Sequence, residues 1–232
     1  MIQVVAHRGY SAAYPENTLS SFAGAYACGA KTVEFDVRKT ADGELVIYHD
    51  ETLERLNGDT KSVADYTYNQ LLNIDAGIWF SDEFAKERIP TLDQTLALLQ
   101  SSGMRMFVEL KDIGNDPTFA TEVYKKVDEY GLLDKVIFSS FNYDYLTQIK
   151  EINSEQPIMV LASFGKSTLP AEYPAEYCGI NMKTLTSRTV RAIHESGALV
   201  YSYTPETKGQ MLSLQRLGVD GVITDSPDLS VM

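Results

Sequence analysis

Short apolar runs rich in β-branched residues recur along the whole chain, and helix-like stretches separate most of them. This alternation is typical of a parallel α/β fold, because parallel neighbours in a sheet need a long crossover connection that is usually a helix. The sequence predicts nine strands: Val4 to Ala6, Val33 to Val37, Leu45 to Tyr48, Met106 to Leu110, Val136 to Ser140, Ile158 to Leu161, Gly179 to Met182, Leu199 to Tyr203 and Gly221 to Thr224.

One connection between these strands is different in kind. Residues 38–44 are too few for a parallel crossover, which takes roughly a dozen residues or more, and they contain Asp42-Gly43, a strong hairpin signal. The run 45–48 must therefore return antiparallel, and eight parallel strands remain. We predict a single (β/α)8 TIM barrel over residues 1–232, a length close to the roughly 250 residues that this fold takes. The alternative is a doubly wound open sheet, but that fold usually has a glycine-rich turn where this chain has His7-Arg8-Gly9.

Residues 51–90 form a connection that is long for a loop of such a barrel, and they carry apolar and aromatic residues of their own. Long ordered loops in compact domains tend to be lids or small inserted subdomains. We therefore predict an inserted cap subdomain over one barrel face, after the second barrel strand and its hairpin. Trp79 and Phe80 are expected either in the core of this cap or at a lip that contacts substrate, with at least one of them in the core.

The charge of the chain argues against a polyanionic partner. Its formal net charge is −12 and its isoelectric point is near 4.7, so long-range attraction to nucleic acid or to an anionic membrane is unfavourable. We expect a small-molecule partner, no nucleic acid, no stable membrane association and a cytoplasmic location, while the oligomeric state is not indicated. Cys28 and Cys178 lack a metal-binding or redox spacing and are expected to be buried apolar residues.

Residues capable of catalysis follow several predicted strands directly. His7 and His49 each come directly after a strand, and the carboxyl ends of barrel strands form the active face of such enzymes. Glu34 and Asp36 are two apart on one strand, so both point to the same face, and Glu109 stands near the end of the next parallel strand. If Asp42-Gly43 supplies the two central residues of the turn, Asp36 is expected opposite His49.

Three carboxylates at one rim repel one another unless a cation or a proton intervenes. A ligand set of oxygen atoms favours one hard divalent ion, Mg²⁺ or Ca²⁺, with Mn²⁺ also suitable. Arg8 and Lys111 add positive charge beside the same rim, so the metal and these two side chains are expected to bind a phosphate group.

The chain resembles the glycerophosphodiester phosphodiesterase family, which is distantly similar to phosphatidylinositol-specific phospholipases C. Matching motifs cover nearly the whole chain in the family order. They are His7-Arg8-Gly9, Pro15-Glu16-Asn17-Thr18, Glu34-Phe35-Asp36-Val37, Asp42-Gly43, His49-Asp50 with Leu53 and Arg55, Ile89-Pro90-Thr91-Leu92, Glu109-Leu110-Lys111, and Gly218 to Asp225. Each motif alone is weak, but the combination is highly specific.

The resemblance implies a TIM barrel enzyme that hydrolyses glycerophosphodiesters to glycerol 3-phosphate and an alcohol. It implies that His7 and His49 act as general acid and base, with either order open. It also implies that Glu34, Asp36 and Glu109 bind the metal and that Arg8 and Lys111 hold the phosphate. Tyr203 stands where relatives often have tryptophan, in the wall that contacts the glycerol or alcohol group.

Two other functions are compatible with the same barrel. A lysophospholipase D-like or phospholipase C-like enzyme would act on lipid and would need an exposed apolar lip. A barrel that binds phosphodiesters without cleaving them would lack a histidine or a carboxylate, and this chain retains all of them.

Some of these residues also have a purely structural interpretation. Arg8 is compatible with an ion pair to Glu16, and Glu109 and Lys111 with a pair at a strand end. Asn17-Thr18 is expected to cap the following helix. The stretch that contains Asp220-Gly221 and Thr224-Asp225 is expected to serve barrel closure and turn formation rather than catalysis.

Overall fold

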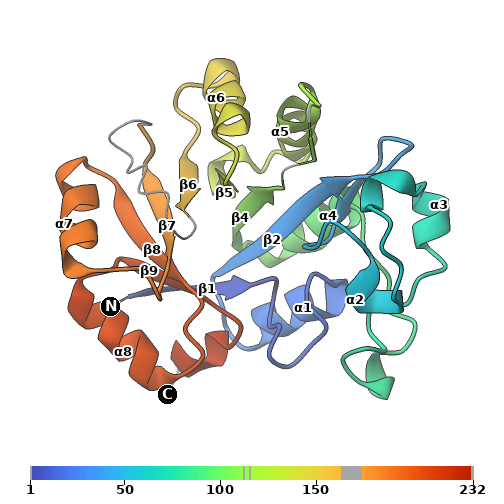
Figure 1. Ribbon diagram of the computed structural model, residues 1–232, viewed down its shortest axis with the longest axis horizontal. Coiled ribbons are helices and arrows are strands. Elements are labelled where there is room, and N and C mark those ends of the chain that lie inside the picture. Colours follow the sequence, from blue (N-terminus) through green and yellow to red (C-terminus); the bar gives the residue numbers. More distant parts are fainter. Residues whose placement is uncertain (1, 112, 115, 163–173, 231–232) are drawn as a thin grey trace.

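The computed structural model describes residues 2–111, 113, 114, 116–162 and 174–230, and it contains a closed barrel of eight parallel strands (Figure 1). The strands follow the order β1-β9-β8-β7-β6-β5-β4-β2, and pairing of β1 with β2 closes the circle. Their bounds are β1 (Gln3–His7), β2 (Thr32–Lys39), β4 (Arg105–Leu110), β5 (Val136–Ser140), β6 (Ile158–Ala162), β7 (Tyr177–Asn181), β8 (Leu199–Tyr203) and β9 (Gly221–Thr224). The predicted TIM barrel is confirmed.

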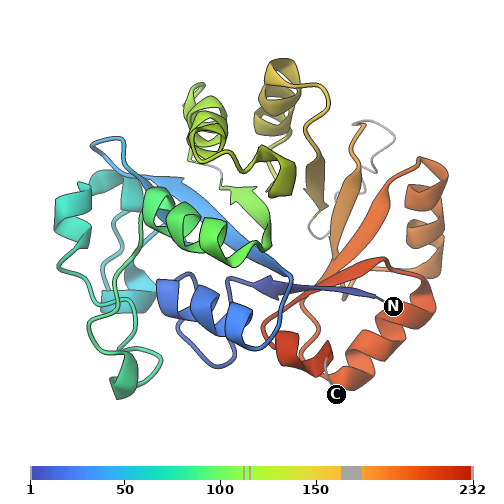
Figure 2. The same cartoon turned by 180° about the vertical axis from the view of Figure 1, so that it is seen from behind.

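Helices lie on the outside of the strands, as the front and back views show (Figures 1 and 2). The α-helices are α1 (Leu19–Ala27), α2 (Glu54–Asn57), α3 (Tyr68–Leu71), α4 (Leu92–Ser102), α5 (Phe119–Glu129), α6 (Tyr143–Ile152), α7 (Ser187–Glu195) and α8 (Lys208–Leu217). Short 3-10 helices span Val63–Asp65, Asp82–Phe84, Leu133–Lys135 and Pro227–Ser230. Thr18 caps α1, because its side chain accepts a hydrogen bond from the backbone N–H of Ser21. The predicted helix cap is therefore correct for Thr18, whereas the side chain of Asn17 binds Asp36 instead.

Two layers of apolar side chains hold the barrel together. One fills its interior, where Phe107, Tyr201 and Tyr177 pack ring against ring. The other lies between the strands and the surrounding helices and includes Val33, Phe35 and Val37 of β2. Because these odd-numbered residues face the helices, the even-numbered carboxylates of β2 face inward toward the mouth.

The hairpin after β2 has a different register from the one expected from its sequence. Its second strand, β3 (Leu45–Ile47), is antiparallel to β2 as predicted, but Val37 lies opposite Ile47 and Lys39 opposite Leu45. The loop contains three residues rather than two, and Gly43 at its end has a left-handed φ of 86°. Tyr48 consequently donates its backbone N–H to Asp36 O at 3.0 Å, so the predicted pairing of Asp36 with His49 is wrong by one residue.

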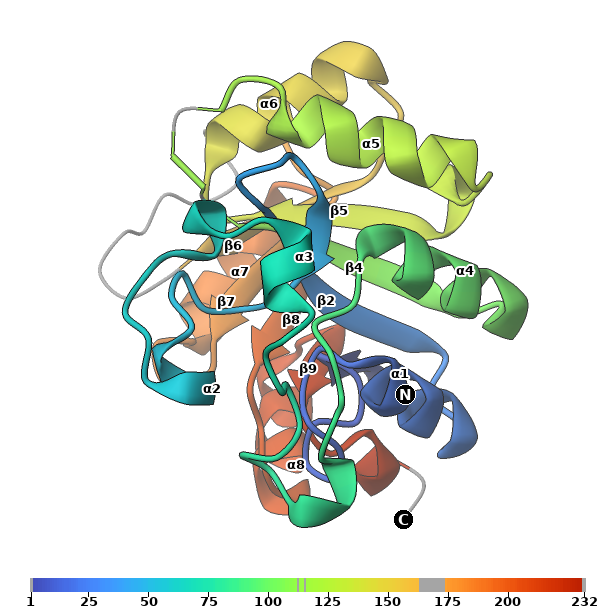
Figure 3. The same ribbon diagram turned by 90° about the vertical axis from the view of Figure 1, so that its right-hand side faces the viewer.

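The insert, residues 51–90, leaves the barrel after this hairpin and lies along one side of it (Figure 3). Its buried side chains Leu53, Val63, Leu71, Ala76 and Ile89 form a small core together with Val46 and Tyr48 of the hairpin. Neither Trp79 nor Phe80 is buried there, so the expectation of at least one in the core is wrong. Trp79 is 38% exposed and Phe80 half-buried, and their rings stack edge to face.

The two cysteines are free thiols, Cys178 buried and Cys28 half-buried, so the expectation of burial holds fully for Cys178 alone. Within the part of the chain that the structure describes, no helix combines the length and apolar character needed to cross a lipid bilayer.

Candidate active site

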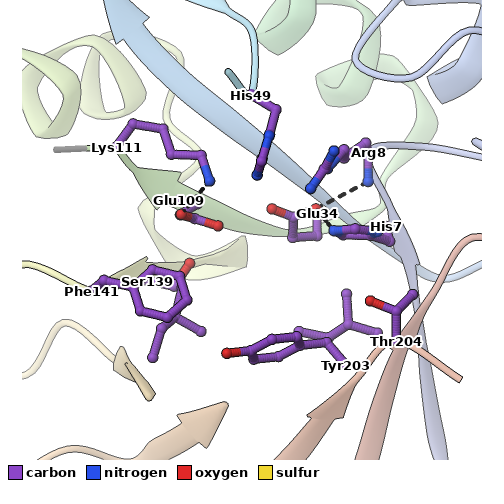
Figure 4. Close-up of a pocket in the computed structure, with 12 residues that line it drawn as sticks. His7, Arg8, Glu34, His49, Glu109, Lys111, Ser139, Phe141, Tyr203 and Thr204 are labelled. Carbon is purple, nitrogen blue, oxygen red and sulfur yellow. Dashed lines mark hydrogen bonds and ion pairs between the residues drawn. The ribbon is translucent and has the colours of Figure 1, made fainter. Parts of the chain in front are cut away.

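A cavity at the carboxyl ends of the barrel strands brings together most of the side chains selected from the sequence (Figure 4). His7 ends β1, Glu109 lies near the end of β4, and His49 follows β3. The cavity is lined by His7, Arg8, Glu34, His49, Glu109, Lys111, Ser139, Phe141, Leu161, Tyr203, Thr204 and Ile223. Asp36 lies beneath this lining and is 1% exposed.

Glu34, Asp36 and Glu109 form a buried acidic cluster, in which one oxygen of each lies within 4.8 Å of the others. Burial, together with the neighbouring carboxylates, raises the pKa of Glu34 well above its ordinary value. Burial also raises the pKa of Glu109, to about 7. For Asp36, burial acts in the same direction, but Lys111 and Arg8 outweigh it and hold its pKa well below the ordinary value. The cluster therefore resists carrying three negative charges without a further cation.

Two basic side chains reach this cluster from opposite sides. The Lys111 ammonium lies 2.6 Å from Glu109 Oε1 and 2.9 Å from Asp36 Oδ1. The Arg8 guanidinium lies with Nε 3.5 Å from Asp36 Oδ2 and pairs with Glu16 Oε1 at 2.8 Å, and the Arg8 backbone N–H donates to Glu34 Oε2 at 3.0 Å. Both ion pairs that the sequence made possible, Arg8 with Glu16 and Lys111 with Glu109, are therefore present. Both cations also line the cavity, where they are available to an anionic ligand.

His7 is held by Asp225, a residue whose position in the sequence predicted a role in barrel closure. Its Nδ1 lies 2.6 Å from Asp225 Oδ1, which also accepts a hydrogen bond from Ser11 Oγ at 3.0 Å. With a carboxylate at Nδ1, the neutral imidazole carries its proton there and leaves Nε2 as the acceptor. Asp225 directly follows β9, and the same rule that selected His7, a polar residue at a strand end, could have identified it.

His49 is oriented in a similar way by its neighbour in sequence. Its Nδ1 lies 2.7 Å from Asp50 Oδ1, and its backbone carbonyl accepts two hydrogen bonds from the Arg38 guanidinium, at 3.1 and 2.8 Å. Burial lowers the pKa of His49 below its ordinary value, although the negative charge of Asp36 opposes that shift. Burial therefore favours the neutral form of the His49 imidazole.

Asn17 binds the acidic cluster through its side chain, a contact that its place in the sequence did not predict. Its side-chain amide donates to Asp36 Oδ2 at 2.7 Å, and the residue is 2% exposed with a left-handed φ of 57°. Asparagine adopts this backbone region more readily than most residues. Asp36 is therefore held by an amide on one oxygen and an ammonium on the other.

The far side of the cavity is largely apolar. Phe141 and Tyr203 lie across from His49 and Lys111, with their rings 6.5 Å apart and nearly perpendicular (Figure 4). The Tyr203 hydroxyl donates to Ala162 O at 2.8 Å, so the ring has a fixed position. The wall with the basic side chains thus suits an anionic group of a ligand, and the wall with Phe141 and Tyr203 suits an apolar part of it.

The acidic cluster has the chemistry of a divalent-metal site. All three side chains offer oxygen, they are buried, and they are close enough to share one ion. Oxygen ligands suit hard cations such as Mg²⁺, Ca²⁺ or Mn²⁺, and such an ion would relieve the repulsion that raises the pKa values of Glu34 and Glu109. The residues present therefore fit a divalent ion.

Fold and site together define a class of protein: a (β/α)8-barrel enzyme with carboxylates, histidines and cations gathered at its strand ends. Residues 7–229 match the glycerophosphoryl diester phosphodiesterase family. The chain belongs to this family of enzymes, as its motifs predicted.

Curated relatives and a solved structure agree with this membership over nearly the full length. The chain is 33% identical over 229 residues to a glycerophosphodiester phosphodiesterase of Caldanaerobacter subterraneus subsp. tengcongensis, covering 97% of this chain and 94% of the relative. It is 32% identical over 240 residues to one of Bacillus altitudinis, covering 100% and 97%. A phosphodiesterase of Oleispira antarctica, solved in complex with the product sn-glycerol-3-phosphate, has a TM-score of 0.91 and 30% identity, covering 97% of this chain and 94% of that one.

Proposed function

We propose that this protein hydrolyses glycerophosphodiesters to glycerol 3-phosphate and the free alcohol, with a divalent metal ion and with His7 and His49 as the proton-transfer groups. The observation that carries the proposal is the placement of two carboxylate-bound imidazoles in one cavity beside a buried acidic cluster. The names of the relatives and the product bound to the Oleispira antarctica structure support the choice of substrate class.

Arg8 and Lys111 would bind the phosphate. A phosphodiester carries one negative charge, which grows on its oxygens as the ester bond breaks. Both cations line the cavity from fixed positions, and donors that are already in place stabilise developing charge with little reorganisation. Tyr203, on the opposite wall, would contact the glycerol or alcohol carbons.

The two histidines would transfer one proton each. One takes a proton from the nucleophile, which is water or the neighbouring glycerol hydroxyl, as its oxygen attacks phosphorus, and the other gives a proton to the alcohol oxygen as its bond to phosphorus breaks. Attack by water gives glycerol 3-phosphate directly, whereas attack by the glycerol hydroxyl gives a cyclic phosphate that water then opens to glycerol 3-phosphate. In both cases Nε2 exchanges the proton, since Nδ1 is bound to Asp225 or Asp50. Either histidine fits either role.

Glu34, Asp36 and Glu109 would hold the metal, with Mg²⁺, Ca²⁺ and Mn²⁺ as the candidates. When bound, the ion would polarise a phosphoryl oxygen and offset its growing charge. Residues 51–90 would act as one inserted cap subdomain beside the cavity. The partner would be a water-soluble small molecule, consistent with a net charge of −12.

The experiment is a substrate and metal panel. Glycerophosphocholine, glycerophosphoethanolamine and lysophosphatidylcholine are assayed for glycerol 3-phosphate and for free alcohol after EDTA treatment, and again with Mg²⁺, Ca²⁺ or Mn²⁺ restored separately. We expect glycerol 3-phosphate from the water-soluble diesters when metal is restored. Faster cleavage of lysophosphatidylcholine would favour a lipid substrate instead, and binding of glycerophosphocholine without any cleavage would favour the non-catalytic alternative.

A further inference from the structure

A series of charged contacts that passes through the insert links two residues that line the cavity, His49 and Arg8. Glu16, in the segment between β1 and α1, accepts two guanidinium groups on the same oxygen, Oε1. Arg8 donates at 2.8 Å from the cavity side, and Arg55 of α2 donates at 2.7 Å from the insert. A residue that lines the cavity and a residue of the insert thus share one carboxylate.

Arg55 also binds the aspartate that contacts His49. Its Nε donates to Asp50 Oδ2 at 2.7 Å, and the second oxygen of Asp50 lies 2.7 Å from His49 Nδ1. The contacts therefore run without a break from His49 through Asp50, Arg55 and Glu16 to Arg8. Arg55 is the central member, and it does not line the cavity itself.

The insert holds the Arg55 side chain in position. The guanidinium lies over the Trp79 ring at 5.2 Å from its centroid, and Trp79 is fixed in turn by a hydrogen bond from Nε1 to Ala76 O at 2.8 Å. Stacking of arginine on an aromatic face stabilises one orientation of the guanidinium. This contact gives Trp79 a role although the ring is partly exposed.

The two carboxylates that flank position 55, Glu16 and Asp50, suit an arginine between them. Burial alone would raise the pKa of Glu16, but Arg8 and Arg55 outweigh it, so the pKa is lowered and the group is ionised. Asp50 behaves in the same way, since Arg55 and His49 outweigh the effect of its burial. Arg55 serves both carboxylates with different nitrogens of one planar group, which a lysine ammonium cannot do with the same geometry.

We infer that Arg55 is a positioning residue of the active site, through which the insert fixes Asp50 against His49 and Glu16 against Arg8. Arg55 acts on catalysis without touching the substrate. The inference rests on the proposed function, in which His49 transfers a proton and Arg8 binds phosphate.

The first test replaces the guanidinium and keeps the apolar stem. For Arg55→Met we expect kcat/KM on glycerophosphocholine with Mg²⁺ to fall roughly 10- to 100-fold, the scale on which a misplaced catalytic group reduces rate. Arg88→Met is the matched control, because Arg88 belongs to the same insert and donates to the backbone of Glu87 instead. It should keep wild-type kinetics. Unfolding midpoints of both variants are measured alongside.

The second test asks whether Arg55 acts through its two carboxylate partners. In double-mutant cycles with Asp50→Asn and with Glu16→Gln, the double variants should be little slower than the slower single variant, because both changes break one path. The inference would be overturned if the rate losses of the two single variants multiplied in the double variant, or if Arg55→Met kept full activity.

Arg55→Lys keeps the positive charge with a smaller change in packing, so it should be more active than Arg55→Met but less active than the wild type. Full activity of Arg55→Lys would show that the site does not require one guanidinium to bind Glu16 and Asp50 at the same time.

These outcomes are separable from failure of the proposed function. An inactive wild type, or an active His49→Ala variant, would contradict the proposed function. An active wild type and an inactive His49→Ala variant, together with unchanged Arg55→Met kinetics, would contradict the positioning role alone.

Discussion

Asp225 Oδ1 lies 2.6 Å from Nδ1 of His7, although 218 positions separate the two residues in the chain. Closure of the barrel makes this contact possible, because β9 pairs with β1 and both strands end at the same rim. His7 Nε2 lies 4.0 Å from Glu34 Oε2 on its other side. The imidazole is thus held between the last strand and the acidic cluster, and its orientation depends on the barrel being closed.

Replacing Asp225 should disturb catalysis more than folding. Asparagine keeps the shape of the side chain but removes the charge that favours a proton at Nδ1 and stabilises the imidazolium. We expect Asp225→Asn to lower kcat on the order of 10²-fold, the scale for misplacing a catalytic group. Steady-state kinetics on glycerophosphocholine with Mg²⁺ measure this effect.

A matched control is available at the opposite end of β9. Asp220 also binds a histidine, with Oδ2 at 2.8 Å from His194 Nε2, but neither residue lines the cavity. Asp220→Asn should retain wild-type kcat. Equal losses in the two variants would mean that Asp225 acts through stability alone.

Loss of either cavity histidine should be severe. A general acid or base typically contributes on the order of 10²- to 10⁴-fold, so His7→Ala and His49→Ala should each lower kcat by that amount. The third histidine of the chain, His194, provides the control, and His194→Ala should leave kcat unchanged. Near wild-type turnover in either cavity variant would contradict the assignment of proton transfer to that residue.

The barrel and the acidic cluster were predictable because both depend on local regularities. Alternation along a strand places Glu34 and Asp36 on one face, and parallel strands end at one rim, where Glu109 and His7 also lie. The hairpin register was predicted incorrectly. Its loop is one residue longer than expected, so Asp36 lies opposite Tyr48 rather than His49. Strand register depends on loop length, and Asp42-Gly43 is compatible with loops of more than one length.

Partners that come from distant parts of the chain were not predictable in the same way. Asn17 was expected to cap α1, since local helix capping explains an asparagine at that position, but its amide binds Asp36 on β2. Asp225 was expected to form a turn for the same reason. Arg55 and Trp79 lie in the insert, whose short helices give little periodic signal. Side-chain contacts between such segments depend on tertiary packing rather than on local pattern.

Packing of the barrel interior can be tested with one pair of glycine substitutions. A Cβ on Gly221 would overlap the Tyr201 ring, so Gly221→Ala should destabilise the fold by about 1 to 3 kcal/mol, as overpacking of a core does. Gly209, in the first turn of α8, has no close neighbour at that position, and Gly209→Ala should be neutral or stabilising by up to about 1 kcal/mol. Urea unfolding compares the two, and equal stability of both variants would contradict this packing.

Metal binding should stabilise the protein more strongly at high pH than at low pH. Burial raises the pKa of Glu109 from 4.5 to about 7, so its stability contribution without metal is complete below about pH 4.5 and is lost as pH rises through about 7. Above that pH the folded protein must carry an additional buried charge, which a divalent ion offsets. We therefore expect Mg²⁺ to raise the unfolding midpoint of EDTA-treated protein more at pH 8 than at pH 6.

The Glu109→Gln variant tests whether this carboxyl is the source of the difference. Glutamine is neutral at both pH values, so the variant should show a smaller Mg²⁺ effect at pH 8 and a weaker dependence on pH. Thermal unfolding with and without Mg²⁺ at the two pH values gives the four midpoints needed for each protein. A Mg²⁺ effect in the wild type that is equal at pH 6 and pH 8 would mean that Glu109 does not exchange a proton for the metal.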